Sequence, residues 1–146
     1  MSLQQPTQKM SKSHADPRSR IILTDTPEEI RKKVMSALTD STNSVSYDPE
    51  TRPGVSNLVE MISIFDEAGR TPQEITEELS GANLRTLKET AADAINRGLG
   101  NIRERYLEVL AKDDGKYIDH VAEQGAQKAR ANAEETMDIV RSAVGL

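Results

Sequence analysis

Two lysines with small hydroxyl residues beside them form the segment of this chain best suited to chemistry. Lys9 and Lys12 are three residues apart, Ser11 lies between them and Ser13 follows. An ammonium group is a compact charge with three donors, and serine hydroxyls also donate to phosphate oxygens. On a mobile loop these groups would hold a polyphosphate and stabilise charge that develops on a leaving pyrophosphate. The alternative is a basic, unstructured tail, which composition alone favours because most charged runs are merely solvated.

The composition argues against several other kinds of site. The 146 residues contain no Cys and only two His, so disulfides and thiolate metal sites are excluded, and we expect no metal site. No apolar run is long enough for a membrane span, and we expect no membrane partner. The net charge is −5, with +2 in residues 1–40 and −7 in residues 41–146. Contact with nucleic acid would therefore use local basic clusters on an acidic body.

The elements that would position the lysines are helices. Residues 1–19 lack periodicity, which indicates a flexible arm, and residues 20–23 indicate a short extended piece. Apolar residues then recur at steps of three and four. Thr26 and Thr71 each begin the pattern Thr-Pro-x-Glu, which places an N-cap, a proline and a glutamate where helices prefer them. We predict an all-α helical bundle with a flexible N-terminal arm.

Turn signals set the expected limits of the helices. The first should end before Asp40, a polar loop should cover residues 41–54, and Gly98 and Gly100 should interrupt the helix that begins near Leu84. The last helix would be roughly 40 Å long at about 1.5 Å per residue. It needs a partner surface, because propensity alone rarely holds a helix in place. The last helix is expected at residues 117–144, and others at residues 55–68, 72–80 and 102–112.

Lys9 to Ser13 spells Lys-Met-Ser-Lys-Ser, the KMSKS signature of class I aminoacyl-tRNA synthetases. The order of further blocks resembles the tryptophanyl-tRNA synthetases of bacteria and mitochondria from residue 8 to residue 146. After Ser13, members of that family usually carry Asp and Pro, whereas this chain has His14, Ala15, Asp16 and Pro17. The blocks that carry the resemblance lie at residues 20–25, 30–34, 37–41, 47–58, 102–106, 125–129 and 145–146.

The resemblance implies roles for the KMSKS loop, residues 9–13. In the family this loop closes over ATP, which carries Mg²⁺, while tryptophan is activated and pyrophosphate leaves. Lys9 and Lys12 would be the catalytic residues that bind the phosphates, with Ser11 and Ser13 holding the loop or touching phosphate. All five residues would belong to the ATP site, although Met10 is expected to pack the loop against the body.

The resemblance also divides the chain. Residues 1–25 would be the loop and linker, and residues 26–146 a helical anticodon-binding domain. No His-Ile-Gly-His type element and no alternating strand–helix pattern is present, so we expect the nucleotide-binding domain to be absent and this fragment alone to be inactive. The first three residues are expected to be a leader that precedes the native sequence.

Two local basic groups are candidates for contact with tRNA. Arginine grips phosphate with two donors and stacks on unpaired bases, which suits the single-stranded anticodon loop of tRNA(Trp). Pairing with nearby glutamates on a helix surface is the alternative for each of these residues. The candidates are Arg97, Arg103 and Arg105 in one group and Lys128 and Arg130 in the other.

A second function remains open at this point, a helical interaction module of synthetase ancestry that no longer binds tRNA. The acidic body favours it, whereas the intact signature favours the tRNA- and ATP-binding function. The family enzymes are homodimers, mainly through the nucleotide-binding domain, so we expect this chain alone to be a monomer. The compartment would be the mitochondrial matrix or the bacterial cytoplasm, and the departures after Ser13 favour the mitochondrial form.

Overall fold

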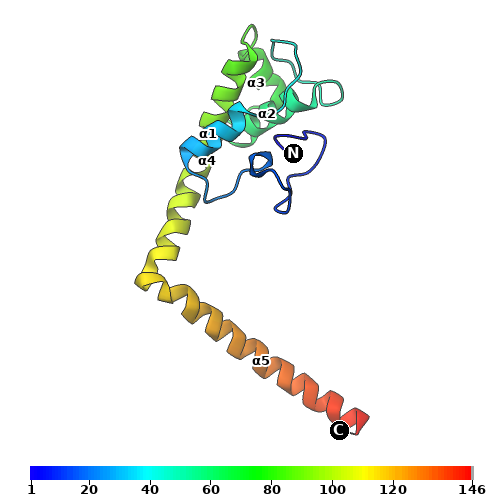
Figure 1. Ribbon diagram of the computed structural model, residues 1–146, viewed down its shortest axis with the longest axis vertical. Coiled ribbons are helices and arrows are strands. Elements are labelled where there is room, and N and C mark those ends of the chain that lie inside the picture. Colours follow the sequence, from blue (N-terminus) through cyan, green and yellow to red (C-terminus); the bar gives the residue numbers. More distant parts are fainter. Residues whose placement is uncertain (146) are drawn as a thin grey trace. The chain divides into compact units, whose positions relative to one another are not determined.

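The computed structural model describes residues 1–145, and every regular element in that range is a helix (Figure 1). The predicted all-α class is confirmed. The chain divides into two compact units, residues 1–103 (the first unit) and residues 104–146 (the second unit). The elements are η1 (Pro17–Ser19), α1 (Pro27–Met35), α2 (Pro53–Ile64), α3 (Pro72–Glu78), α4 (Leu84–Ala111), η2 (Lys112–Gly115) and α5 (Lys116–Val144).

The two predicted capping signals both start helices. At α1 the Thr26 hydroxyl accepts from the Glu29 amide, and the Glu29 carboxylate accepts from the Thr26 amide at 2.8 Å. Thr71 and Glu74 make the same reciprocal pair at α3. Each box satisfies two backbone donors that a helix leaves without partners, and a proline follows each N-cap. These boundaries are therefore fixed by residues within one turn.

One hydrophobic core lies in the first unit. α4 contributes five of its residues and α2 contributes four, which recur at steps of three and four and so face inward. α1 adds Ile30 and Val34, and α3 adds Ile75, which is 2% exposed. The buried apolar residues of the core are Leu3, Ile30, Val34, Ala37, Val55, Leu58, Val59, Ile62, Ile75, Leu87, Ala91, Ala92, Ala94 and Ile95.

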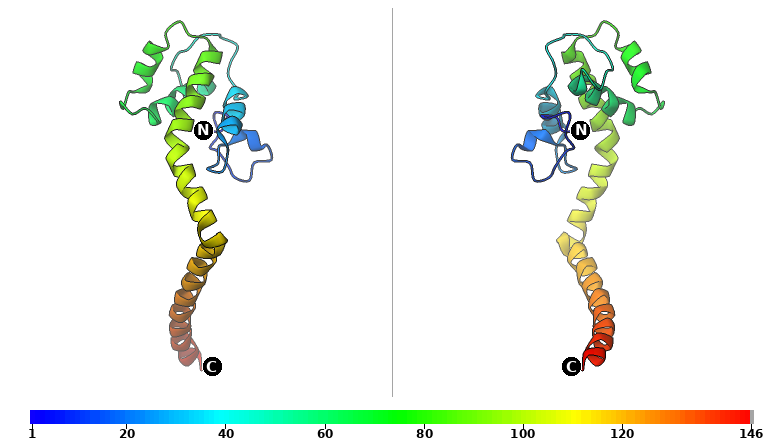
Figure 2. Two further views of the ribbon diagram at one scale, coloured as in Figure 1. Left: turned by 90° about the vertical axis from the view of Figure 1, so that its left-hand side faces the viewer. Right: turned by 90° about the vertical axis from the view of Figure 1, so that its right-hand side faces the viewer.

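The start of the N-terminal arm is part of this core. Leu3 is 1% exposed, its amide donates to the Ser19 carbonyl at 2.9 Å, and its carbonyl accepts from the Leu38 amide at 2.7 Å. Figure 2 shows the N-terminal segment beside α1. The expectation of a flexible arm over residues 1–19 does not fit these contacts at its start. Residues 20–23, expected to be extended, belong to no strand.

The predicted break near residue 100 is wrong, since α4 runs from Leu84 through both glycines to Ala111. Gly98 serves packing, because a Cβ built there would overlap the ring of Phe65 at the end of α2. Gly100 has no atom within 4 Å of such a Cβ, so packing explains only the first glycine. α2 itself ends at Ile64, four residues before the predicted end.

The second unit consists of the end of α4, η2 and α5. α5 spans Lys116–Val144, close to the predicted 117–144. None of the described residues 104–145 is buried. Asp113 and Asp114 adopt left-handed φ angles of 54° and 55° and separate the two helices. Across the described residues, the helices lack a stretch of sufficient length and hydropathy to span a membrane.

Candidate functional site

The KMSKS loop exposes four of its five side chains. Lys9, Ser11, Lys12 and Ser13 are exposed, and only Met10 is half-buried, packed against the core as predicted. The hydrogen bonds of the loop backbone are local. The Ser13 amide donates to the Ser11 hydroxyl, and the His14 amide donates to the Ser11 carbonyl, each at 3.3 Å. The loop thus presents two ammonium groups and two hydroxyls on one short turn.

Hydrogen bonds hold the chain on either side of this loop. Before it, the Gln8 carbonyl accepts from the Ser2 amide at 2.7 Å. After it, the His14 carbonyl accepts from the Arg20 guanidinium at 2.9 Å. In the described part of the chain, residues 9–13 make no hydrogen bond that reaches beyond His14.

The two lysine ammonium groups are available to an anion. The ion pairs of residues 1–145 involve neither Lys9 nor Lys12. The nearest acidic residue in sequence, Asp16, instead binds the Arg18 side chain at 2.9 Å and accepts from its amide. These hydrogen bonds from Arg18 lower the pKa of Asp16 and cap η1. The residues of the loop therefore fit a triphosphate.

A guanidinium clamp fixes the long loop between α1 and α2. Arg52 donates to both carboxylate oxygens of Asp40 at 2.9 Å, to the Ser46 hydroxyl at 2.7 Å and to the Thr42 carbonyl at 2.8 Å. Its hydrogen bonds lower the pKa of Asp40 to about 2. Two residues after Arg52, Gly54 lies so close to the Leu38 carbonyl that a Cβ added to Gly54 would overlap it. Sequence analysis did not anticipate this pair, whose members are 12 residues apart.

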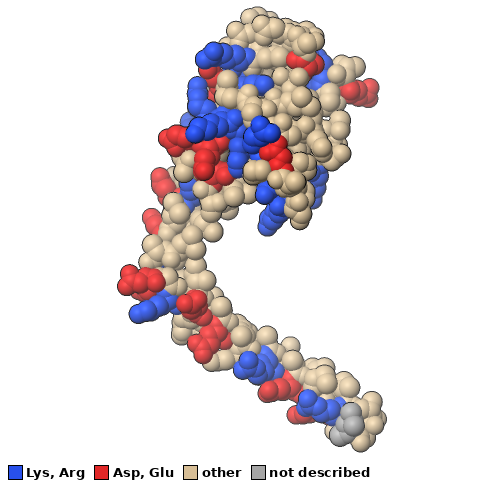
Figure 3. Space-filling model, viewed as in Figure 1, with Lys and Arg blue, Asp and Glu red and all other residues tan. Residues whose placement is uncertain are grey.

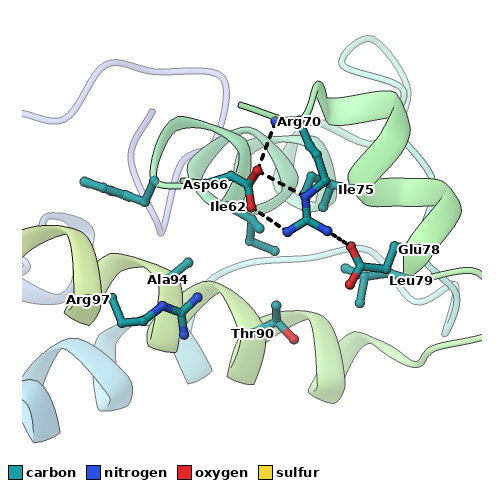
Figure 4. Close-up of a pocket in the computed structure, with 10 residues that line it drawn as sticks. Ile62, Asp66, Arg70, Ile75, Glu78, Leu79, Thr90, Ala94 and Arg97 are labelled. Carbon is teal, nitrogen blue, oxygen red and sulfur yellow. Dashed lines mark hydrogen bonds and ion pairs between the residues drawn. The ribbon is translucent and has the colours of Figure 1, made fainter. Parts of the chain in front are cut away.

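Arg97, a predicted tRNA contact, lines a pocket of about 170 Å³ formed by α2, α3 and α4 (Figure 4). Opposite it, Arg70 forms ion pairs with Asp66 and Glu78, and the side-chain hydrogen bond from Arg70 lowers the pKa of Asp66 to about 2. Arg97 itself takes part in none of the ion pairs in the described part of the chain. Its guanidinium is exposed and has no acidic partner among the described residues.

The other predicted basic residues do not form the local groups expected from sequence. Residues two apart on a helix point about 200° apart, so Arg103 and Arg105 lie on different sides of α4. The same holds for Lys128 and Arg130, both exposed on α5. Arg103 is half-buried, and its Nε and Nη2 atoms have no solvent contact and no hydrogen-bond partner. Only on a strand or loop would such spacing gather side chains on one face.

Comparison with known proteins places the chain in a family. Residues 1–100 match the family of tRNA synthetases class I (W and Y). The chain belongs to that family. Among its relatives, the tryptophan–tRNA ligase of Enterococcus faecalis is 38% identical over 146 residues, and that of Listeria innocua 39% identical over 146 residues. Tryptophan–tRNA ligase 1 of Streptomyces coelicolor is 42% identical over 148 residues.

This class I synthetase chain spans less than half of its relatives' length. It is covered completely by each of the three matches but covers 42%, 43% and 42% of the relatives, in their C-terminal part. The crystal structure of tryptophanyl-tRNA synthetase from Mycoplasma pneumoniae resembles the whole chain and 43% of that protein with a TM-score of 0.67. At 24% identity this likeness shows the fold alone.

The candidate residues of the synthetase chain fall into two sets, those inside the family match and those covered only by the individual relatives. The KMSKS loop and Arg97 lie within residues 1–100, which the family match covers. Arg103, Arg105, Lys128 and Arg130 lie beyond it, in the part covered only by the individual relatives.

Proposed function

We propose that this chain is the C-terminal part of a tryptophan–tRNA ligase, in which it supplies the ATP-phosphate-binding loop and part of the tRNA-binding surface. In that reaction the tryptophan carboxylate attacks the α-phosphate of ATP and pyrophosphate leaves. A hydroxyl at the 3′ end of tRNA(Trp) then attacks the activated carbonyl and AMP leaves. Support comes from the names of relatives that are 38% to 42% identical along the entire chain.

The observation that carries the proposal is the pair of exposed ammonium groups in the KMSKS loop. Neither Lys9 nor Lys12 is neutralised by a carboxylate within residues 1–145. Two such charges three residues apart would bind the β- and γ-phosphates of MgATP. They would then stabilise the negative charge that moves onto pyrophosphate as it leaves.

The test is pyrophosphate exchange by the full-length protein that contains this chain. We expect Lys12→Ala to lower kcat/KM for ATP by about 10²- to 10³-fold, as for other removed donors to a developing charge. Lys32→Ala is the matched control, an exposed lysine on α1 outside the loop. Pyrophosphate exchange at the native rate by the Lys9→Ala, Lys12→Ala double variant would refute the ATP-binding function.

Contact with tRNA(Trp) is the second part of the proposal, and Arg97 is its best candidate. Its guanidinium faces a pocket whose lining includes the aromatic ring of Phe65, which is suited to an unpaired base (Figure 4). Arg103, Arg105, Lys128 and Arg130 stay predictions. On the face seen in Figure 3, basic side chains of the first unit alternate with acidic ones, so specific contacts rather than net charge would bind the RNA.

Filter binding of tRNA(Trp) at several salt concentrations tests this part. We expect Arg97→Ala to weaken binding by about tenfold and to reduce the salt dependence, since each phosphate contact contributes to the slope. Arg85→Ala is the control, because Arg85 lies on the same helix but already pairs with Glu89 at 3.3 Å. Equal binding by both variants would remove Arg97 from the interface. The chain alone is expected to form no tryptophanyl-tRNA.

A further inference from the structure

An apolar pocket of about 240 Å³ lies next to the KMSKS loop within the first unit. Residues 21–23 form its outer rim, where Ile22 and Leu23 are 42% and 41% exposed. Ile95 of α4, 1% exposed, lies on the buried side. Met10 lines the same pocket together with residues of α2 and α4, so the loop touches the helical core through an exclusively apolar lining.

Among residues 9–13, Met10 is the one whose side chain is half-buried and packs against the core. Its four neighbours in the loop are exposed, and the hydrogen bonds of residues 9–13 reach no further than His14 in the described structure. Lys9 precedes Met10 directly and Lys12 follows two residues later. Wherever the Met10 side chain packs, it therefore restricts the positions of both ammonium groups.

We propose that Met10 is a positioning residue that tethers the KMSKS loop to the helical core and so places Lys9 and Lys12 on the phosphates of ATP. The inference rests on the proposed function. Methionine has three rotatable bonds and a polarisable thioether, which lets it slide along an irregular apolar wall. The pocket leaves free volume beside Met10, so the side chain can keep its apolar contact in more than one position of the loop.

The tether is tested first in the 146-residue chain without any nucleotide, by amide exchange of Ser13 and His14, whose amides donate the hydrogen bonds of the loop turn. We expect Met10→Ala to raise the exchange rate there by about five- to tenfold, because the apolar area that resists local opening is lost. Met10→Leu should keep the native rate, since leucine is also apolar and of similar volume. Met137→Ala, the same deletion at an exposed position of α5, should change nothing in the loop.

The second readout separates positioning from a purely structural effect. In the full-length enzyme, Met10→Ala should raise KM for MgATP about five- to tenfold and leave KM for tryptophan unchanged, with Met10→Leu restoring the native value. Trypsin cleavage after Lys9 and Lys12 should be faster in Met10→Ala than in the native enzyme. MgATP should slow this cleavage more in the native enzyme than in Met10→Ala.

The possible outcomes keep the two proposals apart. Unchanged loop exchange in Met10→Ala would overturn the tether, whatever the lysine variants do. Faster amide exchange with an unchanged KM for MgATP would also overturn it, because the tether would then have no effect on phosphate binding. If instead Lys12→Ala keeps full pyrophosphate-exchange activity, the ATP-binding function itself fails. Faster amide exchange and a higher KM for MgATP in Met10→Ala, with native values of both in Met10→Leu, support the inference.

Discussion

Both units of this chain are built from helices, yet only one of them has a core. The first unit buries fourteen apolar residues, whereas the second buries none of the described residues 104–145. Both contain apolar side chains at helical spacing. In α4, Leu87 and Ile95 are 0% and 1% exposed, but Tyr106 and Leu110 on the same helix are 38% and 41% exposed. An amphipathic pattern therefore shows which face of a helix can be buried, and only a facing surface buries it.

This difference implies different sources of stability. In the first unit, helices α1 to α3 are short, at 9, 12 and 7 residues, and such lengths are marginal for an isolated helix. Their persistence depends on the shared core. α5 has 29 residues, which gives it more helical hydrogen bonds but no buried side chain within its own unit. Matched substitutions in the two units test this difference in stability.

The largest effect is expected at Ile95. Ile95→Ala should lower the free energy of unfolding by about 2–5 kcal/mol, because it removes a fully buried side chain and leaves a cavity. Urea unfolding followed by circular dichroism measures it. A loss below about 1 kcal/mol would mean that α4 is not tied to the core as its burial indicates.

The two glycines of α4 should respond in opposite directions. Gly98→Ala should destabilise the first unit by about 1–3 kcal/mol, because the new methyl group overlaps the Phe65 ring. Gly100→Ala has open space around it and should stabilise the helix by about 0.5–1 kcal/mol. Thermal unfolding of the pair distinguishes packing from backbone entropy, and stabilisation by both alanines would show that the Phe65 contact is dispensable.

A smaller effect is expected from the clamp that holds the loop of the first unit. The pKa of Asp40 is about 2 in the folded protein, below its ordinary value of 3.8, because Arg52 donates to it. The clamp therefore makes its full contribution to the free energy of unfolding above about pH 4, and this contribution is lost as the pH falls towards 2. The contribution should be less than about 1 kcal/mol, since the pair is partly solvated.

Urea midpoints of the native protein and of Asp40→Asn, measured at pH 6 and pH 2.5, test this linkage. The native protein should lose more stability than the variant over that interval, because only the native carboxylate takes up a proton on acidification. Parallel losses in the two proteins would exclude Asp40 as a source of the acid sensitivity.

The smallest effect is expected at Ile139 on α5, which is 68% exposed. Ile139→Ala deletes the same atoms as Ile95→Ala, yet it should change the free energy of unfolding by less than about 0.5 kcal/mol. Differential scanning calorimetry of both variants gives a direct comparison. A loss of 2 kcal/mol or more, the range of a buried site, would reveal that this face of α5 is covered.

The sequence by itself determined the features that depend on neighbours within one helical turn. It predicted the two capping boxes, the helical class and the span of α5, since capping bonds and helical periodicity involve residues three or four apart. It also identified the KMSKS loop, because the chemistry of two lysines and two hydroxyls is carried by five consecutive residues.

Only the tertiary structure decided which of these features meet. Leu3 and Leu38, Gly98 and Phe65, and Arg52 and Asp40 are contacts between residues 12 or more apart, which no local pattern encodes. The structure likewise placed Arg97 in a pocket, separated Arg103 from Arg105, and seated Met10 against α2 and α4. The physical reason is that burial needs two surfaces, and a sequence pattern describes one surface at a time.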